Sequence, residues 1–238
     1  LVMKSNFFSS AIMKTSVISK EFRDRYLSDP KNLNVFNGKA IVFEGPEDYH
    51  KRINDKKLKI DENSILIIRG CGPVGYPGSA EVVNMQPPDR LLKKGITHLP
   101  TLGDGRQSGT SESPSILHVS PESAVGGDLG IIKTGDKMKI DLNKRRVDLL
   151  ISQSEFKKRR KNKKIFKANN QTPWQEIFRD TVGQLEDGAC INSRGNYLDV
   201  SHKKVFQEIL IKMKPKILVT RKLSDGAEEK LKKNFDVT

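Results

Sequence analysis

The stretch ILIIRGCGPVGYPGSAE, residues 65–81, decides between two fold classes. A short apolar run rich in β-branched residues predicts a strand over 64–69. Gly70, Gly72 and Gly75 follow it with the spacing G-x-G-x-x-G, which after a strand is typical of a dinucleotide-binding turn in a doubly wound α/β fold. The alternative is a tight loop whose glycines permit positive φ angles.

The residues around these glycines argue against a dinucleotide. Such a site needs a helix N-terminus directly after the glycines, so that its amides face the pyrophosphate. Pro73 and Pro77 donate no amide hydrogen, and no helix is expected before Ser79. The region about 20 residues further on reads PPDRLLKKG and shows no strand that ends in an acidic residue. We therefore favour the tight loop, which leaves Glu81 unexplained.

The flanking segments predict a mainly β fold with flanking helices (α+β). Strands are expected at 39–43 and 64–69, and alternating apolar residues at 138–142 and 147–151 predict a β-hairpin. The strands are short, and no repeating strand–helix–strand pattern or internal repeat is visible. This pattern favours a small β-barrel or layered β structure with helices packed outside it.

Three capping signals predict helix starts. Ser19 begins a helix within SKEFRDRYLSD, and Ser120 begins one in SPESA with Glu122 in its first turn. Thr172 caps an amphipathic helix that is expected to end at Gly188. Its expected apolar face consists of Trp174, Ile177, Phe178 and Leu185.

Composition bounds the class of protein. The chain has 238 residues, 35% of them hydrophobic, with no apolar run long enough for a transmembrane helix and no secretory signal at its start. It begins on Leu1 rather than Met, which indicates a fragment. Two cysteines, Cys71 and Cys190, are too few for a disulfide framework or a four-ligand metal site. We expect a cytoplasmic protein with no membrane contact.

The formal net charge of +14 raises the question of nucleic-acid binding. Much of the basic character lies in FKKRRKNKKIFK, residues 156–167, and in the last 26 residues. Aromatic residues do not interleave with the basic block as stacking platforms for bases would. A solvated helix face or linker is the favoured interpretation, contact with a polyanion is the alternative, and a nucleic-acid partner is not expected.

A second glycine-rich segment resembles a known family. The stretches DGRQSGT (104–110) and SPESAVGG (120–127), taken with the loop over 69–85, resemble the dihydroxy-acid and sugar-acid dehydratases, also called the IlvD/Edd family. NFFSSAIMKTSVIS and AIVFEGPEDYHKRI resemble the C-terminal region of that family, and the resemblance covers roughly residues 6–205. The form GPVGYPGSAE and TPWQEI are similar to the sugar-acid branch, the L-arabinonate, D-xylonate and related aldonate dehydratases.

The resemblance implies a fold and a reaction. The family's C-terminal domain is similar to the swivelling β-barrel domain of aconitase-like proteins. The reaction is a dehydration by a hydro-lyase, which converts a 2,3-dihydroxy sugar acid to a 2-keto-3-deoxy acid. The full-length enzyme holds Mg²⁺ and an iron–sulfur cluster whose ligands lie in a larger N-terminal domain, which is missing here. A homo-oligomer, dimer or tetramer, is implied, and the isolated fragment is expected to be inactive.

The resemblance also assigns roles to residues. Ser108 falls on the family's serine base, Thr110 and Arg106 on positions near the substrate, and Glu81 on the magnesium ligand that the C-terminal domain contributes. Asp104 with Arg106 can equally be an ion pair that braces the loop, and Lys14 is a further candidate near the substrate carboxylate. His118 is more consistent with a structural role than with a general base. The alternatives are a dihydroxy-acid dehydratase of branched-chain amino-acid synthesis and a non-catalytic module that binds through its basic block.

These assignments divide the chain into four parts. Residues 1–37 are a lead-in segment with a helix, 38–155 the β-barrel-like domain, and 156–212 a basic linker with a helical segment. Residues 213–238 resemble the first strand and helix of D-2-hydroxy-acid dehydrogenases. We expect this tail to derive from a neighbouring reading frame.

Overall fold

A computed structural model describes most of the first 191 residues. The described ranges are 1–77, 85–106, 112–163, 165 and 171–191, with 216–217, 229 and 236–237. The chain divides into two compact units, Leu1–Asn192 and Ser193–Thr238. In the second unit, β9 (Lys216–Ile217) pairs in parallel with β10 (Asp236–Val237). This pair does not test the proposed origin of the tail, which stays a prediction.

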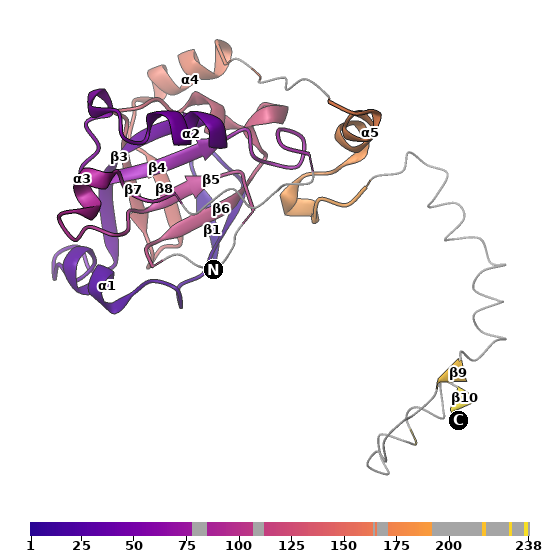
Figure 1. The fold of residues 1–238 in the computed structure, drawn as a ribbon, viewed down its shortest axis with the longest axis horizontal. Helices are drawn as coiled ribbons and strands as arrows, with labels where there is room; N and C mark the ends of the chain where they lie inside the picture. Colours follow the sequence, from indigo (N-terminus) through magenta and orange to yellow (C-terminus); the bar gives the residue numbers. More distant parts are fainter. Residues whose placement is uncertain are drawn as a thin grey trace. The chain divides into compact units, whose positions relative to one another are not determined.

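The first unit is a closed barrel with helices outside it (Figure 1). The strand order is β1-β2-β6-β5-β4-β3-β7-β8, and parallel pairing of β1 with β8 closes the ring. The strands are β1 (Val2–Ser5), β2 (Ser10–Met13), β3 (Val35–Glu44), β4 (Ser64–Arg69), β5 (Thr101–Gly103), β6 (Ser115–Ser120), β7 (Lys137–Asp141) and β8 (Arg146–Leu149). The α-helices are α1 (Lys20–Tyr26), α2 (Pro46–Arg52), α3 (Asp89–Leu92), α4 (Gln153–Lys161) and α5 (Pro173–Thr181). The expected mainly β class is confirmed.

The continuous apolar run of β4 follows from burial on both faces. Ile65 and Ile67 belong to the core inside the barrel. Leu66 and Ile68 belong to a second core, which also contains Tyr49 of α2 and residues around α3. A strand covered on both sides favours apolar residues at successive positions, so the run Ile65–Ile68 lacks the alternation of a half-exposed strand.

The predicted hairpin is confirmed. β7 and β8 pair antiparallel, with Met138 opposite Leu149 and Ile140 opposite Val147. All four side chains are buried in the barrel core. The alternation of apolar and polar residues therefore predicted correctly which side chains of the hairpin face the barrel core.

The first 37 residues contribute more than the expected lead-in and helix. They contain α1, but they also supply β1 and β2, which pair antiparallel and complete the barrel. Met3, Ala11 and Met13 point into the core. Strands of four residues carry too few alternating positions to be recognised from sequence.

Two of the capping signals are confirmed, and two boundaries are wrong. The Ser19 and Thr172 side chains accept hydrogen bonds from Phe22 N and Gln175 N and begin α1 and α5. However, α5 ends at Thr181, because Val182 is extended, and a 3₁₀ turn, η4 (Leu185–Asp187), precedes Gly188. No helix starts at Ser120: a 3₁₀ turn, η2 (Ser123–Val125), follows Glu122 instead.

The basic block forms part of α4, and its charges are partly neutralised within the fold. Arg159 pairs with Asp136 at 2.5 Å and with Glu155 at 2.7 Å. Arg160 and Lys163 both pair with Asp128 of η3 (Asp128–Ile131), at 2.5 and 2.9 Å. The block therefore fastens α4 to the η3 turn, and fewer of its cations are available to a polyanion than the sequence indicates.

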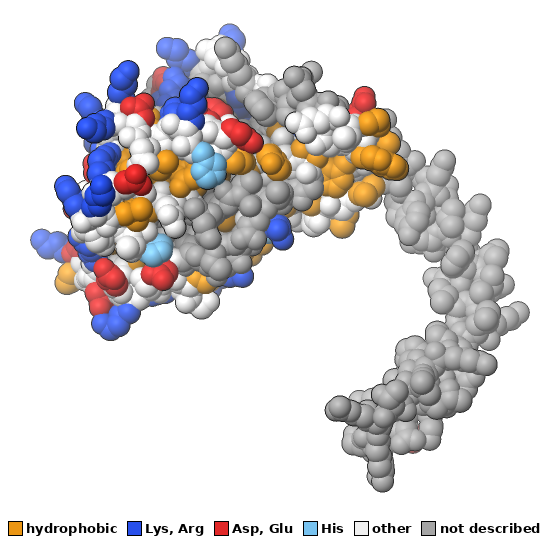
Figure 2. Space-filling model, in the orientation of Figure 1, with side chains coloured by type: hydrophobic (Ala, Val, Ile, Leu, Met, Phe, Trp, Pro, Cys, Tyr) orange, Lys and Arg blue, Asp and Glu red, His pale blue; other side chains and the backbone are white. Residues whose placement is uncertain are grey.

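On the face shown in Figure 2, Lys and Arg side chains lie along the left and upper edges of the barrel, with Asp and Glu side chains among them. Hydrophobic side chains gather over α5. Trp174 and Ile177 of α5 are 79% and 53% exposed, so the predicted apolar face is not buried in the described chain. No described helix is both long and apolar enough to cross a membrane.

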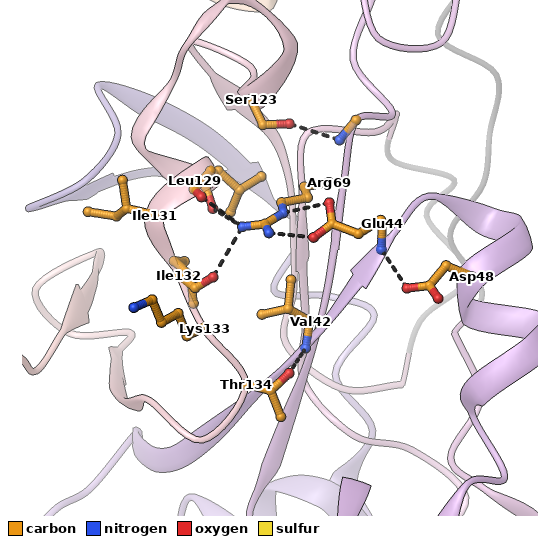
Figure 3. Close-up of polar contacts among 12 residues, drawn as sticks. Val42, Glu44, Asp48, Arg69, Ser123, Leu129, Ile131, Ile132, Lys133 and Thr134 are labelled. Carbon is orange, nitrogen blue, oxygen red and sulfur yellow. Dashed lines mark hydrogen bonds and ion pairs between the residues drawn. The ribbon is translucent and has the colours of Figure 1, made fainter. Parts of the chain in front are cut away.

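Arg69 ties the ends of two strands to the η3 segment (Figure 3). Its guanidinium pairs with Glu44, the last residue of the neighbouring strand β3. The Nη1 atom also donates to the carbonyl oxygens of Leu129, Gly130 and Ile132, at 3.3, 2.9 and 3.1 Å. Only the branched guanidinium can serve both groups at once.

Replacing Arg69 with Lys should therefore destabilise the barrel. Lysine keeps the charge but cannot reach the carboxylate and the carbonyl oxygens together, so we expect a loss of about 1–3 kcal/mol in the free energy of unfolding. Urea denaturation measures this loss. Arg146→Lys is the control, because Arg146 pairs with Asp148 at the surface and its loss should stay below about 1 kcal/mol. Equal losses in the two variants would contradict the assignment.

Candidate active site

Two glycine-rich loops leave the same rim of the barrel. Strands β3, β4, β5 and β6 run parallel to one another, so their carboxyl ends meet at one edge. The loop from Gly70 follows β4, and the loop from Asp104 follows β5. Ligand sites in parallel sheets lie beyond the carboxyl ends of the strands. This rim is therefore the candidate active site.

Asp104 is the anchor of the rim. Its side chain is fully buried and accepts hydrogen bonds from Gly70 N at 3.1 Å and Cys71 N at 2.8 Å. It also accepts from the amide and hydroxyl of Ser123, at 2.9 and 2.6 Å. One carboxylate thus joins the loops that follow β4, β5 and β6. The described bonds of Asp104 run to backbone amides and Ser123, and the expected ion pair with Arg106 stays a prediction.

Glu122 holds the far end of the first loop. Its buried carboxylate accepts from Val74 N and Gly75 N, both at 2.9 Å, and from Gln184 Nε2 at 3.0 Å. Burial raises the pKa of this carboxyl, and the three donors oppose that shift. The sequence placed Glu122 in the first turn of a helix and did not indicate its buried role.

The glycine spacing is explained by this packing. A Cβ atom on Gly72 would collide with the Glu122 carboxylate, and one on Gly75 would lie 2.7 Å from the Gly70 carbonyl oxygen. The amides of Gly70, Cys71, Val74 and Gly75 are all bound by buried carboxylates. They are not available to a pyrophosphate, so the dinucleotide interpretation is rejected on geometry.

The residues assigned by resemblance lie mostly outside the described chain. Glu81, Ser108 and Thr110 fall in the ranges 78–84 and 107–111, so their positions are not described. Arg106 is described and exposed, two residues after Asp104 in the chain. The structure brings the approaches to both ranges to one rim, and the roles of these four residues stay predictions.

His118 lies inside β6 at a bulge. Its φ angle is +56°, and β6 contains one extra residue opposite β2 at this point. Its backbone amide donates to the Gly105 carbonyl oxygen at 2.9 Å, which steadies the start of the second loop. Burial, with the Arg106 charge, lowers the pKa of the imidazole below its usual value of 6.5. Its Nε2 atom is buried and has no hydrogen-bond partner among the described residues.

The described residues do not by themselves form a metal site. No group of three or more His, Cys, Asp or Glu side chains is arranged for a metal among them. The oxygen atoms of Asp104 and Glu122 are already occupied by protein donors. Burial raises the pKa of the Cys71 thiol, so it stays protonated and is a poor ligand.

A cavity of about 940 Å³ borders the braced loop. Gly70, Tyr76 and Pro77 contribute to its wall, together with residues of α4 and α5. Its lining carries both signs of charge, including Arg69, Lys158 and Glu44. The position of the Gly70–Pro77 loop therefore also sets the shape of this cavity.

Replacing Glu122 with Gln should loosen the loop. The carboxylate accepts hydrogen bonds from three N–H donors. The NH₂ group of glutamine would face one of these donors, so one hydrogen bond would be lost. We expect a loss of about 1–3 kcal/mol in unfolding free energy. Chemical denaturation at neutral pH measures it. Glu21→Gln on the exposed face of α1 should change stability by less than about 0.5 kcal/mol. A fully stable Glu122→Gln variant would show that the neutral side chain serves equally well.

His118 should make stability depend on pH. The unfolded chain binds a proton at His118 at a higher pH than the native chain, so the unfolding free energy falls as the pH drops through 6.5. Asn tolerates a positive φ angle, so His118→Asn should fold with a shallower acid dependence. Urea midpoints from neutral to mildly acidic pH compare the two. Parallel profiles would contradict the prediction.

Comparison with known proteins identifies the family. The family model described as dihydroxy-acid/6-phosphogluconate dehydratase C-terminal matches residues 1–189. The chain is 57% identical over 203 residues to the D-xylonate dehydratase of Caulobacter vibrioides. The matched region covers 85% of this chain and 34% of that protein. It is 48% identical over 128 residues to the L-arabinonate dehydratase of Rhizobium leguminosarum bv. trifolii, covering 54% and 22%.

A dihydroxy-acid dehydratase from Thermodesulfovibrio yellowstonii is 39% identical over 157 residues, covering 66% of this chain and 28% of that protein. The chain thus spans about one third or less of the length of these relatives. These comparisons show that the chain belongs to the dihydroxy-acid/6-phosphogluconate dehydratase family, in its C-terminal domain.

Proposed function

We propose that this chain is the C-terminal part of a sugar-acid dehydratase, a hydro-lyase that converts a 2,3-dihydroxy aldonate to a 2-keto-3-deoxy acid. The 57% identity to a D-xylonate dehydratase supports the sugar-acid branch. One structural observation carries the proposal further. The loops that lead to Glu81 and Ser108 leave neighbouring parallel strands and share the Asp104 anchor.

In this proposal Ser108 removes the proton at C2 of the substrate. The C3 hydroxyl leaves as water, and the resulting enol tautomerises to the ketone, so the net change is the loss of one water molecule. A serine acts as a base only where positive charge and hydrogen-bond donors stabilise its alkoxide. Arg106 supplies a cation two residues away in the chain, and it contacts the substrate together with Thr110.

The proposal includes Mg²⁺ and an iron–sulfur cluster, which supply Lewis acidity toward the substrate's oxygen atoms. Glu81 is the one residue of this chain assigned to Mg²⁺, and its carboxylate suits a hard cation. The family resemblance assigns the remaining ligands to an N-terminal domain, and this chain covers only 34% of the length of the D-xylonate dehydratase that it matches. We further propose a cytoplasmic homo-oligomer and a barrel of the swivelling type.

Two other functions are weaker candidates. A dihydroxy-acid dehydratase of branched-chain amino-acid synthesis is the alternative within the family, supported by 39% identity to such an enzyme. A non-catalytic module that binds a polyanion through its basic block is the alternative outside it. The pairing of Arg159, Arg160 and Lys163 within the fold disfavours that module.

A reconstituted enzyme tests the proposal. The chain is combined with the N-terminal part of its full-length protein, and 2-keto-3-deoxy acid is assayed with D-xylonate, L-arabinonate and a branched 2,3-dihydroxy acid. Ser108→Ala should lower turnover of a sugar acid about 10²–10⁴-fold without loss of folding. Ser111→Ala, in the same loop, is the matched control. Retained turnover in Ser108→Ala would refute the base assignment, and turnover of only the branched acid would favour the alternative enzyme.

A further inference from the structure

The last turn of α5 and the segment that follows it reach back to the rim of the barrel. Arg179 Nε donates to the Val74 carbonyl oxygen at 2.8 Å. Glu186 bonds to the Ser9 hydroxyl, and its amide donates to Ser120 Oγ at 3.4 Å. These contacts hold residues 179–186 against three separate parts of the barrel.

Gln184 makes the most specific of these contacts. Its Oε1 atom accepts from Glu122 N at 2.8 Å, and its Nε2 atom donates to Glu122 Oε1 at 3.0 Å. The carboxamide thus binds the backbone and the side chain of one buried residue at once. A carboxylate at position 184 would repel Glu122, and a short apolar side chain would satisfy neither group.

Glu122 connects Gln184 to the Gly70–Pro77 loop. The same Oε1 atom accepts from Val74 N, and Oε2 accepts from Gly75 N. The chain of bonds therefore runs from Gln184 through Glu122 to the amides at the end of the G-x-G-x-x-G turn. From Gly75 the backbone continues six residues to Glu81.

We propose that Gln184 is a positioning residue, which acts through Glu122 to hold the Gly70–Pro77 loop in the geometry that presents Glu81 to its metal. The last part of this inference rests on the proposed function, whereas the hold on the loop does not. Gln184 does not contact substrate in this scheme. Its Nε2 supplies one of the three hydrogen bonds that favour the charged carboxylate and oppose the rise in the pKa of Glu122 that burial causes.

The charges around Glu122 should make the opening of the Gly70–Pro77 loop depend on pH. Among the described residues, the titratable groups that face Glu122 are Asp104, whose negative charge raises the pKa of Glu122, and the Cys71 thiol, which stays protonated. Removing the Gln184 donor should raise the pKa of Glu122 further. A protonated Glu122 accepts less well from Val74 N and Gly75 N. As the pH is lowered, the loop should therefore open at a higher pH in the variant than in the unsubstituted chain.

Amide hydrogen exchange on the 238-residue chain tests the hold on the loop. In Gln184→Ala, protection of the Val74 and Gly75 amides should fall at least about tenfold, corresponding to about 1.4 kcal/mol of local opening. The pH at which the remaining protection is lost should move upward. Gln175→Ala is the matched control, because Gln175 lies in the same segment and bonds locally to Gln171 N. Unchanged protection, or an unchanged pH midpoint, in Gln184→Ala would overturn the positioning role.

Mn²⁺ binding followed by electron paramagnetic resonance, with Mn²⁺ as a probe for Mg²⁺, tests the link to the metal in the reconstituted protein. Gln184→Ala should weaken Mn²⁺ binding several-fold and raise the half-saturating Mg²⁺ concentration, with kcat at saturating Mg²⁺ within about twofold of the unsubstituted enzyme. A fall in kcat alone would indicate a merely structural role and overturn the link. If Glu81→Gln leaves Mn²⁺ binding intact, the proposed function's metal assignment fails, whereas the exchange result on the loop still stands.

Discussion

The burial of the Asp104 carboxylate is the constraint on which the rim of this barrel depends. An unpaired charge in the interior would be strongly destabilising, and here four hydrogen bonds from the loops after β4 and β6 compensate it. The loops after β4, β5 and β6 are thereby joined at one point rather than each being held by its own contacts. Glu122 repeats the arrangement for the amides of Val74 and Gly75. Rigid loops of this kind suit a site that must hold reacting groups in a fixed geometry.

Much of the barrel could be predicted from local patterns, because the patterns report burial. The apolar run of β4 and the alternation in β7 and β8 reflect which faces are covered. The site could not be predicted in the same way. Asp104 and Gly70 are 34 residues apart, and Gln184 and Glu122 are 62 apart, so nothing in either neighbourhood indicates the other. The resemblance to a family supplied Ser108 and Glu81, whereas the buried carboxylate network became visible only from the three-dimensional contacts.

Two local signals were misleading for identifiable reasons. Ser120, Pro121 and Glu122 have the order of a helix start, but Glu122 is needed as a buried acceptor and the turn begins after it. The basic block over residues 156–167 likewise overstated the free positive surface. Asp128 and Asp136 lie outside the basic block in sequence, yet they neutralise Arg159, Arg160 and Lys163 in the fold. Charge read along a chain does not include partners that folding brings from elsewhere.

The closure of the ring by β1 and β8 has a consequence for aggregation. A closed barrel exposes no strand edge, and β1 pairs with β2 on one side and with β8 on the other. Opening the seam between β1 and β8 would leave two backbone edges whose unpaired amide and carbonyl groups face solvent. Such edges recruit strands of other molecules, so the pairing of β1 with β8 also protects the barrel from intermolecular β-sheet formation.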